Sequence, residues 1–250
     1  MLPTETKLNE FVNRLKEIAA ANLQSVILYG SAARGDYRPD HSDLNLLCVL
    51  GSLAIEELAR AAPVVRWWVV EQKEPPPLFF TAEELRQSAD VFSIEIRDMQ
   101  DSRRVLFGSD PIAAIKLPTN LHRVQVEHEL RTLILKLRSS YFQAPGDAAH
   151  LTPILRKSFS EALVLLRHVI IAFGQEPPAA PRDIIKQASA LTQSNATAFE
   201  TVLQLRDHGG SHSDIAHVYG AYLAALQKVI LALDRHLPKH EWQRTKQAHS

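Results

Sequence analysis

The chain has 250 residues, enough for one large or two modest domains, and 46% of them are hydrophobic, which excludes an intrinsically disordered protein. The 28 basic and 28 acidic residues cancel, so no net charge directs the chain to nucleic acid, and we expect neither nucleic acid nor a membrane as a partner. We see no apolar run of the roughly 20 residues that span a bilayer. The single cysteine, Cys48, lies in an apolar run, which favours a reducing, cytoplasmic setting.

An amphipathic helix is predicted over residues 4–21, because apolar residues recur there at helical spacing from Leu8 to Ala19. The charged residues of this segment, Lys7 among them, are expected on the opposite, solvated face. We expect the apolar face to pack on the core of the protein.

Two short apolar runs, residues 25–29 and 44–50, predict buried strands joined by a tight turn. Gly30 directly follows the first run, where it lets the backbone turn sharply and a ligand approach closely. The amides of Ser31, Ala32 and Ala33 would then begin a helix, where unpaired N–H groups and the helix dipole attract phosphate. The alternative is an ordinary turn in which Ser31 only caps a helix.

Polar side chains also gather at the start of the second run. Ser42 and Asp43 precede it, and Asn45 follows Asp43 by two residues, so the side chains of Asp43 and Asn45 leave the same face of the strand. Mg²⁺ in proteins is usually held by one or two carboxylates together with phosphate oxygens and water. Arg34, in the turn, is suited to bidentate contacts with phosphate, although a solvated loop charge is the alternative. These residues predict a site for a nucleoside triphosphate with Mg²⁺.

The order Gly30-Ser31, then Asp43-Leu44-Asn45, resembles the DNA polymerase β-type nucleotidyltransferase superfamily, which includes aminoglycoside and other small bacterial nucleotidyltransferases. The resemblance implies an enzyme that transfers a nucleoside monophosphate from an NTP, with ATP expected, to a hydroxyl of a small molecule, a protein or RNA. It implies nucleotide contacts from Gly30, Ser31, Arg34 and Ser42, with Asp43 as a catalytic and metal-binding residue.

Asn45 departs from the pattern of the superfamily, whose active members usually carry Asp at this position. The amide removes one negative charge from the expected metal site, which Asn45 would still share with Asp43. Two functions therefore stay open. The chain is an Mg²⁺-dependent nucleotidyltransferase, or it is a catalytically weak or inactive homologue that acts as a nucleotide-binding or regulatory partner protein.

Further along the chain, residues 52–62 predict a helix that begins after Ser52 and ends at Pro63. Residues 64–70 are rich in Val and Trp and predict a third strand. An extended connector is expected at residues 75–77, which are three prolines, and Thr81 is expected to cap a short helix that reaches residue 88.

Residues 91–98 alternate between apolar and polar side chains, which predicts a half-buried strand. The superfamily carries a third carboxylate on the strand beside the Asp43–Asn45 strand, and the resemblance implies that Glu95 is this residue. Glu95 would complete the metal site or act as a catalytic base toward the acceptor hydroxyl. Asp98 is its competitor, and a solvent-facing glutamate on an amphipathic strand is the alternative.

From residue 119 the chain becomes helical, with five helices expected between residues 121 and 237. We therefore predict an α/β (α+β) mixed-sheet nucleotidyltransferase domain over residues 1–118, an all-α helical bundle that binds substrate over residues 119–237, and a polar tail over residues 238–250. The active-site cleft is expected between the two domains. A homodimer is the expected assembly, since dimers are the commonest oligomers.

Overall fold

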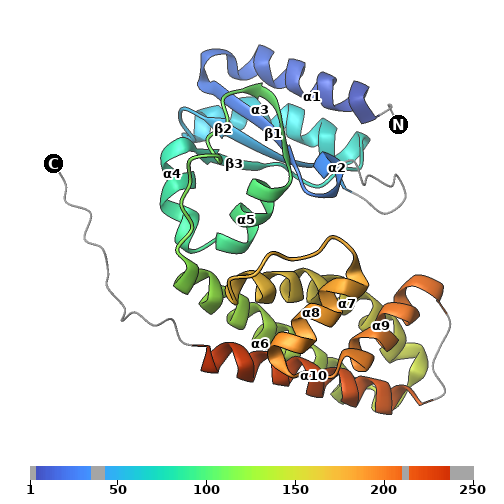
Figure 1. The fold of residues 1–250 in the computed structure, drawn as a ribbon. Helices are drawn as coiled ribbons and strands as arrows, with labels where there is room; N and C mark the ends of the chain where they lie inside the picture. Colours follow the sequence, from blue (N-terminus) through green and yellow to red (C-terminus); the bar gives the residue numbers. More distant parts are fainter. Residues whose placement is uncertain (1–3, 35–42, 210–213, 237–250) are drawn as a thin grey trace. The chain divides into compact units, whose positions relative to one another are not determined.

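The chain forms two compact units, residues 1–118 and residues 119–250. Residues 4–34, 43–209 and 214–236 are described by the computed structural model, so the predicted polar tail lies outside the described residues. The predicted fold class is confirmed: a mixed four-stranded sheet with flanking helices precedes a helical region (Figure 1).

The sheet consists of β1 (Leu23–Tyr29), β2 (Asn45–Leu50), β3 (Leu78–Thr81) and β4 (Arg103–Gly108). Its strand order is β3-β2-β1-β4. Strand β1 runs antiparallel to both β2 and β4, whereas β2 runs parallel to β3. Tyr29 pairs with Asn45, so the end of β1 lies beside the start of β2.

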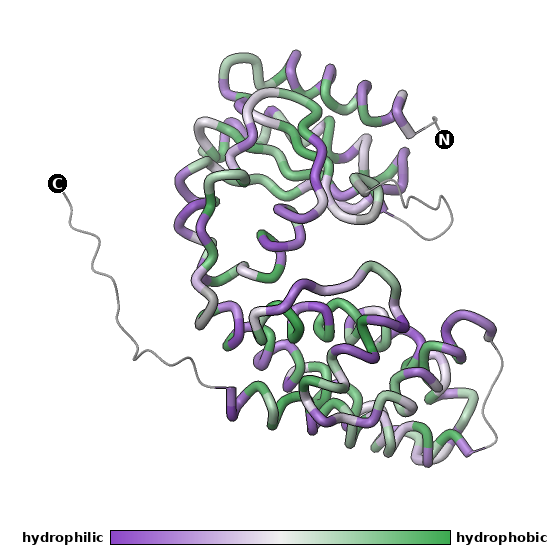
Figure 2. Tube along the Cα trace, viewed as in Figure 1, coloured by the Kyte–Doolittle hydropathy of each residue, from purple (hydrophilic) through white to green (hydrophobic). Residues whose placement is uncertain are grey.

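Helices cover both faces of this sheet. α1 (Thr4–Ala19) and α3 (Ile55–Arg66) pack on one face, and α4 (Ala82–Gln87) and α5 (Ser93–Asp101) pack on the other (Figure 1). Alternate residues of β2 enter the two clusters, Leu46 on the α1 side and Leu47 on the α5 side. Figure 2 shows the hydrophobic residues that run along β1 and β2. Both strands are therefore buried on two faces, as their short apolar runs predict.

The predicted strand at residues 64–70 is wrong. α3 continues through Pro63 to Arg66, and a π-helical turn, Trp67–Glu71, follows it. Both tryptophans are buried, and the ring of Trp68 lies 4.9 Å from that of Phe11 in α1, centroid to centroid. Packing against α1 therefore overrides the strand preference of this Val- and Trp-rich run. The helix also begins at Ile55, three residues after the predicted cap.

The predicted strand at residues 91–98 is wrong as well, because this segment lies in and before α5. Ser93, Ile96 and Met99 are buried at steps of three residues, which is a helical and not a strand period. In place of the two wrongly predicted strands, the sheet is completed by β3, a short run after the prolines that was not predicted, and by β4. The capping box at Thr81 is confirmed, with Glu84 as its partner.

Short elements connect these parts: the 3-10 turns Ala20–Asn22 and Ser88–Asp90, and α2 (Ser31–Arg34). The helical unit contains α6 (Thr119–Gln143), α7 (Ala148–Ala172), α8 (Pro181–Thr192), α9 (Ala196–His208) and α10 (Ile215–Arg235). α10 is long and apolar enough to cross a membrane, which the sequence reading did not anticipate. This is weak evidence for a span, because nine residues of α10 are buried in the helical unit, and core helices pass the same test.

Candidate nucleotide-binding site

The predicted site begins where β1 ends. Gly30 has φ +81°, in the left-handed region, and a Cβ built on it would lie 3.3 Å from Nδ2 of Asn45. The Gly30 N–H donates to the carbonyl of Ser102 at 3.0 Å, which ties the turn to the segment before β4. The structure therefore brings two predicted residues, Gly30 and Asn45, into direct proximity, and a Cβ at residue 30 would be in tight contact with the Asn45 side chain.

The turn after Gly30 is the single-turn helix α2. The N–H of Ala33 donates to the carbonyl of Gly30 at 3.1 Å. One of the three amides predicted to face phosphate is therefore used inside the turn. The side chains of Ser31 and Arg34 are not among those the structure describes, and Ser42 lies outside the described residues. Their predicted contacts with the nucleotide stay predictions.

Asp43 and Asn45 flank Leu44 at the start of β2. Asp43 is exposed, Asn45 is half-buried, and Leu44 is fully buried in the cluster on the α1 side of the sheet. The strand alternation places Asn45 on the same face as Leu47, which is the α5 side. An exposed carboxylate and an amide oxygen thus stand at one end of the sheet, next to Gly30.

Glu95 lies in the first turn of α5 and not on a strand, and its side chain is exposed. It stays close to the end of β1, because its negative charge contributes to the raised pKa of Tyr29. Burial is the larger cause of this shift, which takes the pKa of Tyr29 to about 12. The resemblance implies a third carboxylate on a strand beside β2, but neither neighbour of β2, β1 (Leu23–Tyr29) or β3 (Leu78–Thr81), includes an acid.

Two residues next to the motif, Lys7 and Glu74, were not predicted as part of the site. They form an ion pair with Nζ and Oε1 2.6 Å apart, and the other Glu74 oxygen accepts the N–H of Leu44 at 3.0 Å. Lys7 was expected on the solvated face of its helix, yet it is 3% exposed. One signal was present: Lys7 precedes Phe11 by four residues, which puts both on one face of α1.

The side chains at this site suit a metal ion that takes most of its ligands from phosphate oxygens and water. Among the residues that the structure describes, no group of three His, Cys, Asp or Glu side chains is placed to hold a metal. Mg²⁺ bound to a triphosphate needs only one or two protein carboxylates, since phosphate oxygens and water complete its octahedron. Asp43, with the amide oxygen of Asn45, fits that requirement.

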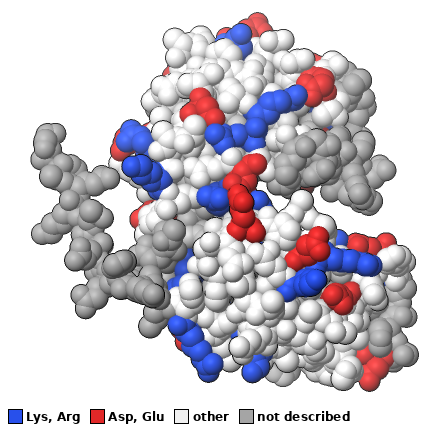
Figure 3. Space-filling model, viewed as in Figure 1, with Lys and Arg blue, Asp and Glu red and all other residues white. Residues whose placement is uncertain are grey.

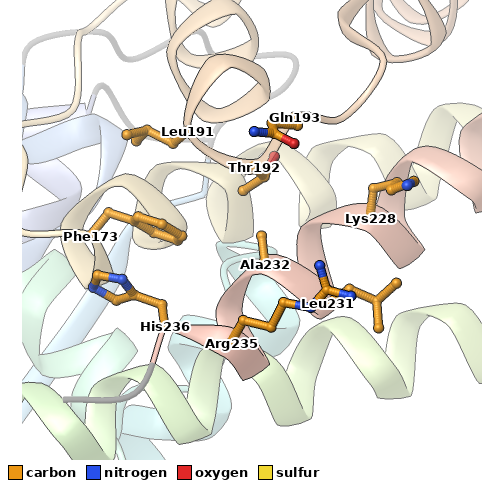
Figure 4. Close-up of a pocket in the computed structure, with 9 residues that line it drawn as sticks. All are labelled: Phe173, Leu191, Thr192, Gln193, Lys228, Leu231, Ala232, Arg235 and His236. Atoms are coloured by element: carbon orange, nitrogen blue, oxygen red, sulfur yellow. The ribbon is translucent and has the colours of Figure 1, made fainter. Parts of the chain in front are cut away.

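The helical unit has a hollow of its own, with a volume of about 330 Å³, near the ends of α8 and α10. Figure 4 shows Lys228, Arg235 and His236 around it, and the His236 ring stacks on Phe173 with centroids 4.3 Å apart. It contains none of the predicted site residues. On the face shown in Figure 3, basic and acidic side chains are interspersed and form no continuous basic stripe.

Two comparisons with known proteins gave matches for this chain. Residues 8–109 match the family model of the nucleotidyltransferase domain. The structure is similar to the crystal structure of spectinomycin adenyltransferase AAD(9) from Enterococcus faecialis with ATP and spectinomycin, with a TM-score of 0.51 and 15% sequence identity. The match covers 90% of this chain and 98% of the other, so it includes the helical region. A comparison with curated proteins gave no significant match. Residues 8–109 therefore form a nucleotidyltransferase domain of the DNA polymerase β-like type, the N-terminal part of this chain.

Proposed function

We propose that the chain binds a nucleoside triphosphate, ATP first, at the turn after β1 and transfers its nucleoside monophosphate to a hydroxyl of a small molecule. The observation that carries the proposal is the meeting of Gly30 and Asn45 at the junction of β1 and β2, within the segment that matches the nucleotidyltransferase domain. The similar crystal structure was solved with ATP and spectinomycin, which supports a small molecule as the acceptor.

In the proposed reaction, the acceptor oxygen forms a bond to the α-phosphorus of ATP, and the bond to the β-phosphate oxygen breaks, so pyrophosphate leaves. The glycine turn would position the triphosphate, and Asp43 and Asn45 would hold the Mg²⁺ that neutralises its charge. Glu95 is the candidate base for the proton of the acceptor hydroxyl, because it lies on the Asn45 side of the sheet and close to Tyr29.

A second candidate function is nucleotide binding with little or no transfer. Two observations favour it: Asn45 replaces a carboxylate, and β3 brings no acid to the neighbouring position. With a single carboxylate at the start of β2, the site has less negative charge to hold the metal ion during transfer. Such a protein would act as a sensor of nucleotide or as a regulatory partner.

Calorimetry with ATP and Mg²⁺ separates these functions from an unrelated use of the fold. We expect the wild-type protein to bind ATP only when Mg²⁺ is present and Asp43→Ala to lose this binding. Release of pyrophosphate, measured with spectinomycin as the first acceptor and other aminocyclitols next, would support the enzyme. Binding of ATP without pyrophosphate release from any acceptor supports the second candidate, and absence of ATP binding contradicts both.

A further inference from the structure

The buried pair Lys7–Glu74 connects three segments of the N-terminal unit. Lys7 comes from α1, and Glu74 comes from the loop between the π-helical turn and β3. Their side chains are only 4% and 7% exposed, and Lys7 also donates to the carbonyl of Gln72 at 3.4 Å. The remaining Glu74 oxygen accepts the backbone N–H of Leu44, the residue between Asp43 and Asn45.

The N–H of Leu44 needs this acceptor because neither neighbouring strand of β2 pairs with Leu44. The pairing with β1 ends at Asn45, and the pairing with β3 ends at Leu47. Leu44 is fully buried, so water does not reach its N–H. A buried N–H without a partner costs about as much free energy as a lost hydrogen bond. The Glu74 carboxylate therefore continues the hydrogen bonding of β2 beyond the point where its neighbouring strands stop.

Glu74 is itself held by the core. Its N–H donates to the carbonyl of Trp68 at 3.3 Å, and Nε1 of Trp68 donates to the carbonyl of Pro75 at 3.0 Å. Trp68 is fully buried against Phe11 of α1. The Glu74 carboxylate, which accepts the Leu44 N–H, thus belongs to a turn that is hydrogen-bonded to Trp68 and packed around its side chain.

We propose that Glu74, with its charge neutralised by Lys7, is a positioning residue that fixes the backbone of Asp43-Leu44-Asn45 for nucleotide binding. The proposal rests on the function proposed above. Glu74 acts through the Leu44 N–H, which lies between the two side chains predicted to hold the metal and its nucleotide. Lys7 is needed because a lone carboxylate at this depth would be strongly unfavourable.

Two double variants isolate the oxygen that accepts the Leu44 N–H. Lys7→Met/Glu74→Gln and Lys7→Met/Glu74→Met both remove the two charges and keep the side-chain length at residue 74, but only the first keeps an oxygen there. We expect the Gln variant to protect the Leu44 amide from hydrogen exchange and to bind Mg²⁺–ATP within about threefold of wild type, since a neutral amide replaces the acceptor. We expect the Met variant to lose the protection and at least about tenfold in ATP affinity.

A third variant covers the case in which the Met variant does not fold. Glu74→Asp keeps the charge but shortens the side chain, so that it cannot reach Lys7 and Leu44 together. We expect Glu74→Asp to fold, to exchange the Leu44 amide faster than wild type, and to bind Mg²⁺–ATP more weakly. Melting temperatures of all variants show which of them are folded at the temperature of the binding measurement.

The outcomes separate this proposal from the function on which it rests. A wild-type protein that binds no ATP overturns the proposed function, and the positioning role falls with it. A wild-type protein that binds ATP, with equal affinity in folded Gln and Met variants or in Glu74→Asp, overturns the positioning role alone. Undiminished protection of the Leu44 amide in the Met variant or in Glu74→Asp also contradicts the proposal, because another group would then accept that N–H.

Discussion

The start of β2 and Glu95 were expected to supply one metal site, but the structure positions them by different means. The positions of Asp43 and Asn45 are set by the pairing of β1 with β2, by the close approach of Gly30, and by the buried Lys7–Glu74 pair, which accepts the N–H of Leu44. Glu95 is exposed on a helix, and it is linked to the site through the effect of its charge on the pKa of Tyr29. A backbone held by several distant segments thus defines the first position, whereas one helix orients the second.

Breaking the support of β2 should have the largest effect on the protein. Lys7→Met leaves the Glu74 carboxylate buried without a cation, so we expect the free energy of unfolding to fall by about 3–5 kcal/mol. Urea unfolding followed by circular dichroism measures this change. The matched control is Glu5→Gln, which breaks the ion pair of the same helix with Arg104, whose side chains are 66% and 44% exposed.

The control should change the free energy of unfolding by only about 0–1 kcal/mol, because an exposed pair gains little over solvation. Equal effects of Lys7→Met and Glu5→Gln would show that burial does not distinguish the two ion pairs. In that case the start of β2 would owe its position to the strand pairing alone.

The turn that faces Asn45 gives the next largest effect. Gly30→Ala forces a residue with Cβ to φ +81° and puts that Cβ 3.3 Å from Nδ2 of Asn45. We expect the free energy of unfolding to fall by about 1–2 kcal/mol from the left-handed backbone alone. The affinity for Mg²⁺–ATP should fall as well, since Asn45 must move. Gly146→Ala is the control: its φ is +75°, but a Cβ there meets nothing within 4 Å.

Both glycine variants should lose comparable stability, and only Gly30→Ala should lose ATP affinity. A loss of ATP affinity in Gly146→Ala, or no loss in Gly30→Ala, would show that the Gly30–Asn45 contact is not part of the ATP-binding site.

The sequence was sufficient for β1, β2 and the turn at Gly30 because each apolar run is short, buried on both faces and bounded by turn residues. It was insufficient for Val64–Val70 and for α5. In the first case, Trp68 packs on Phe11 and Trp67 on the guanidinium of Arg14, both from α1, and a local preference for β-strand does not include contacts so distant in the sequence. In the second case, eight residues with alternating apolar side chains also fit a helix that buries residues 93, 96 and 99.

The candidate site likewise contains residues that the sequence predicts and residues that it does not. Gly30, Asp43 and Asn45 are adjacent to strand ends in the sequence, so their proximity follows from the pairing of β1 with β2. Lys7 and Glu74 are 67 residues apart, and each looks like an ordinary surface charge in its own segment. Only the packing of α1 and of the loop before β3 against β2 brings them to Leu44.

Restoring a carboxylate at the start of β2 should have a smaller effect, one that sharpens the comparison with Glu95. Asn45→Asp adds a negative charge beside Asp43, so we expect about a tenfold gain in affinity for Mg²⁺–ATP, which corresponds to about 1.4 kcal/mol. ATP without Mg²⁺ should bind more weakly to this variant than to wild type, since like charges repel. Calorimetry with and without the metal measures both changes, and a gain in both conditions would contradict a metal site at residue 45.

The smallest effect expected concerns Glu95 and the tyrosine at the end of β1. Glu95→Gln removes a negative charge near Tyr29, so the pKa of Tyr29 should fall from about 12 but stay above its usual 10, because burial is the larger cause of the shift. Absorbance titration of wild type and variant, each compared with its Tyr29→Phe counterpart, isolates the titration of Tyr29.

Since the pKa of folded Tyr29 exceeds that of the unfolded chain, its contribution to stability is complete below pH 10 and is lost as the pH rises through about 12. Glu161→Gln is the matched control, because the Glu161 charge raises the pKa of Tyr222 in the helical unit and should leave Tyr29 unchanged. A Tyr29 pKa that is the same in wild type and Glu95→Gln would place the Glu95 carboxylate away from the end of β1 and would contradict its proposed role as the base of the site.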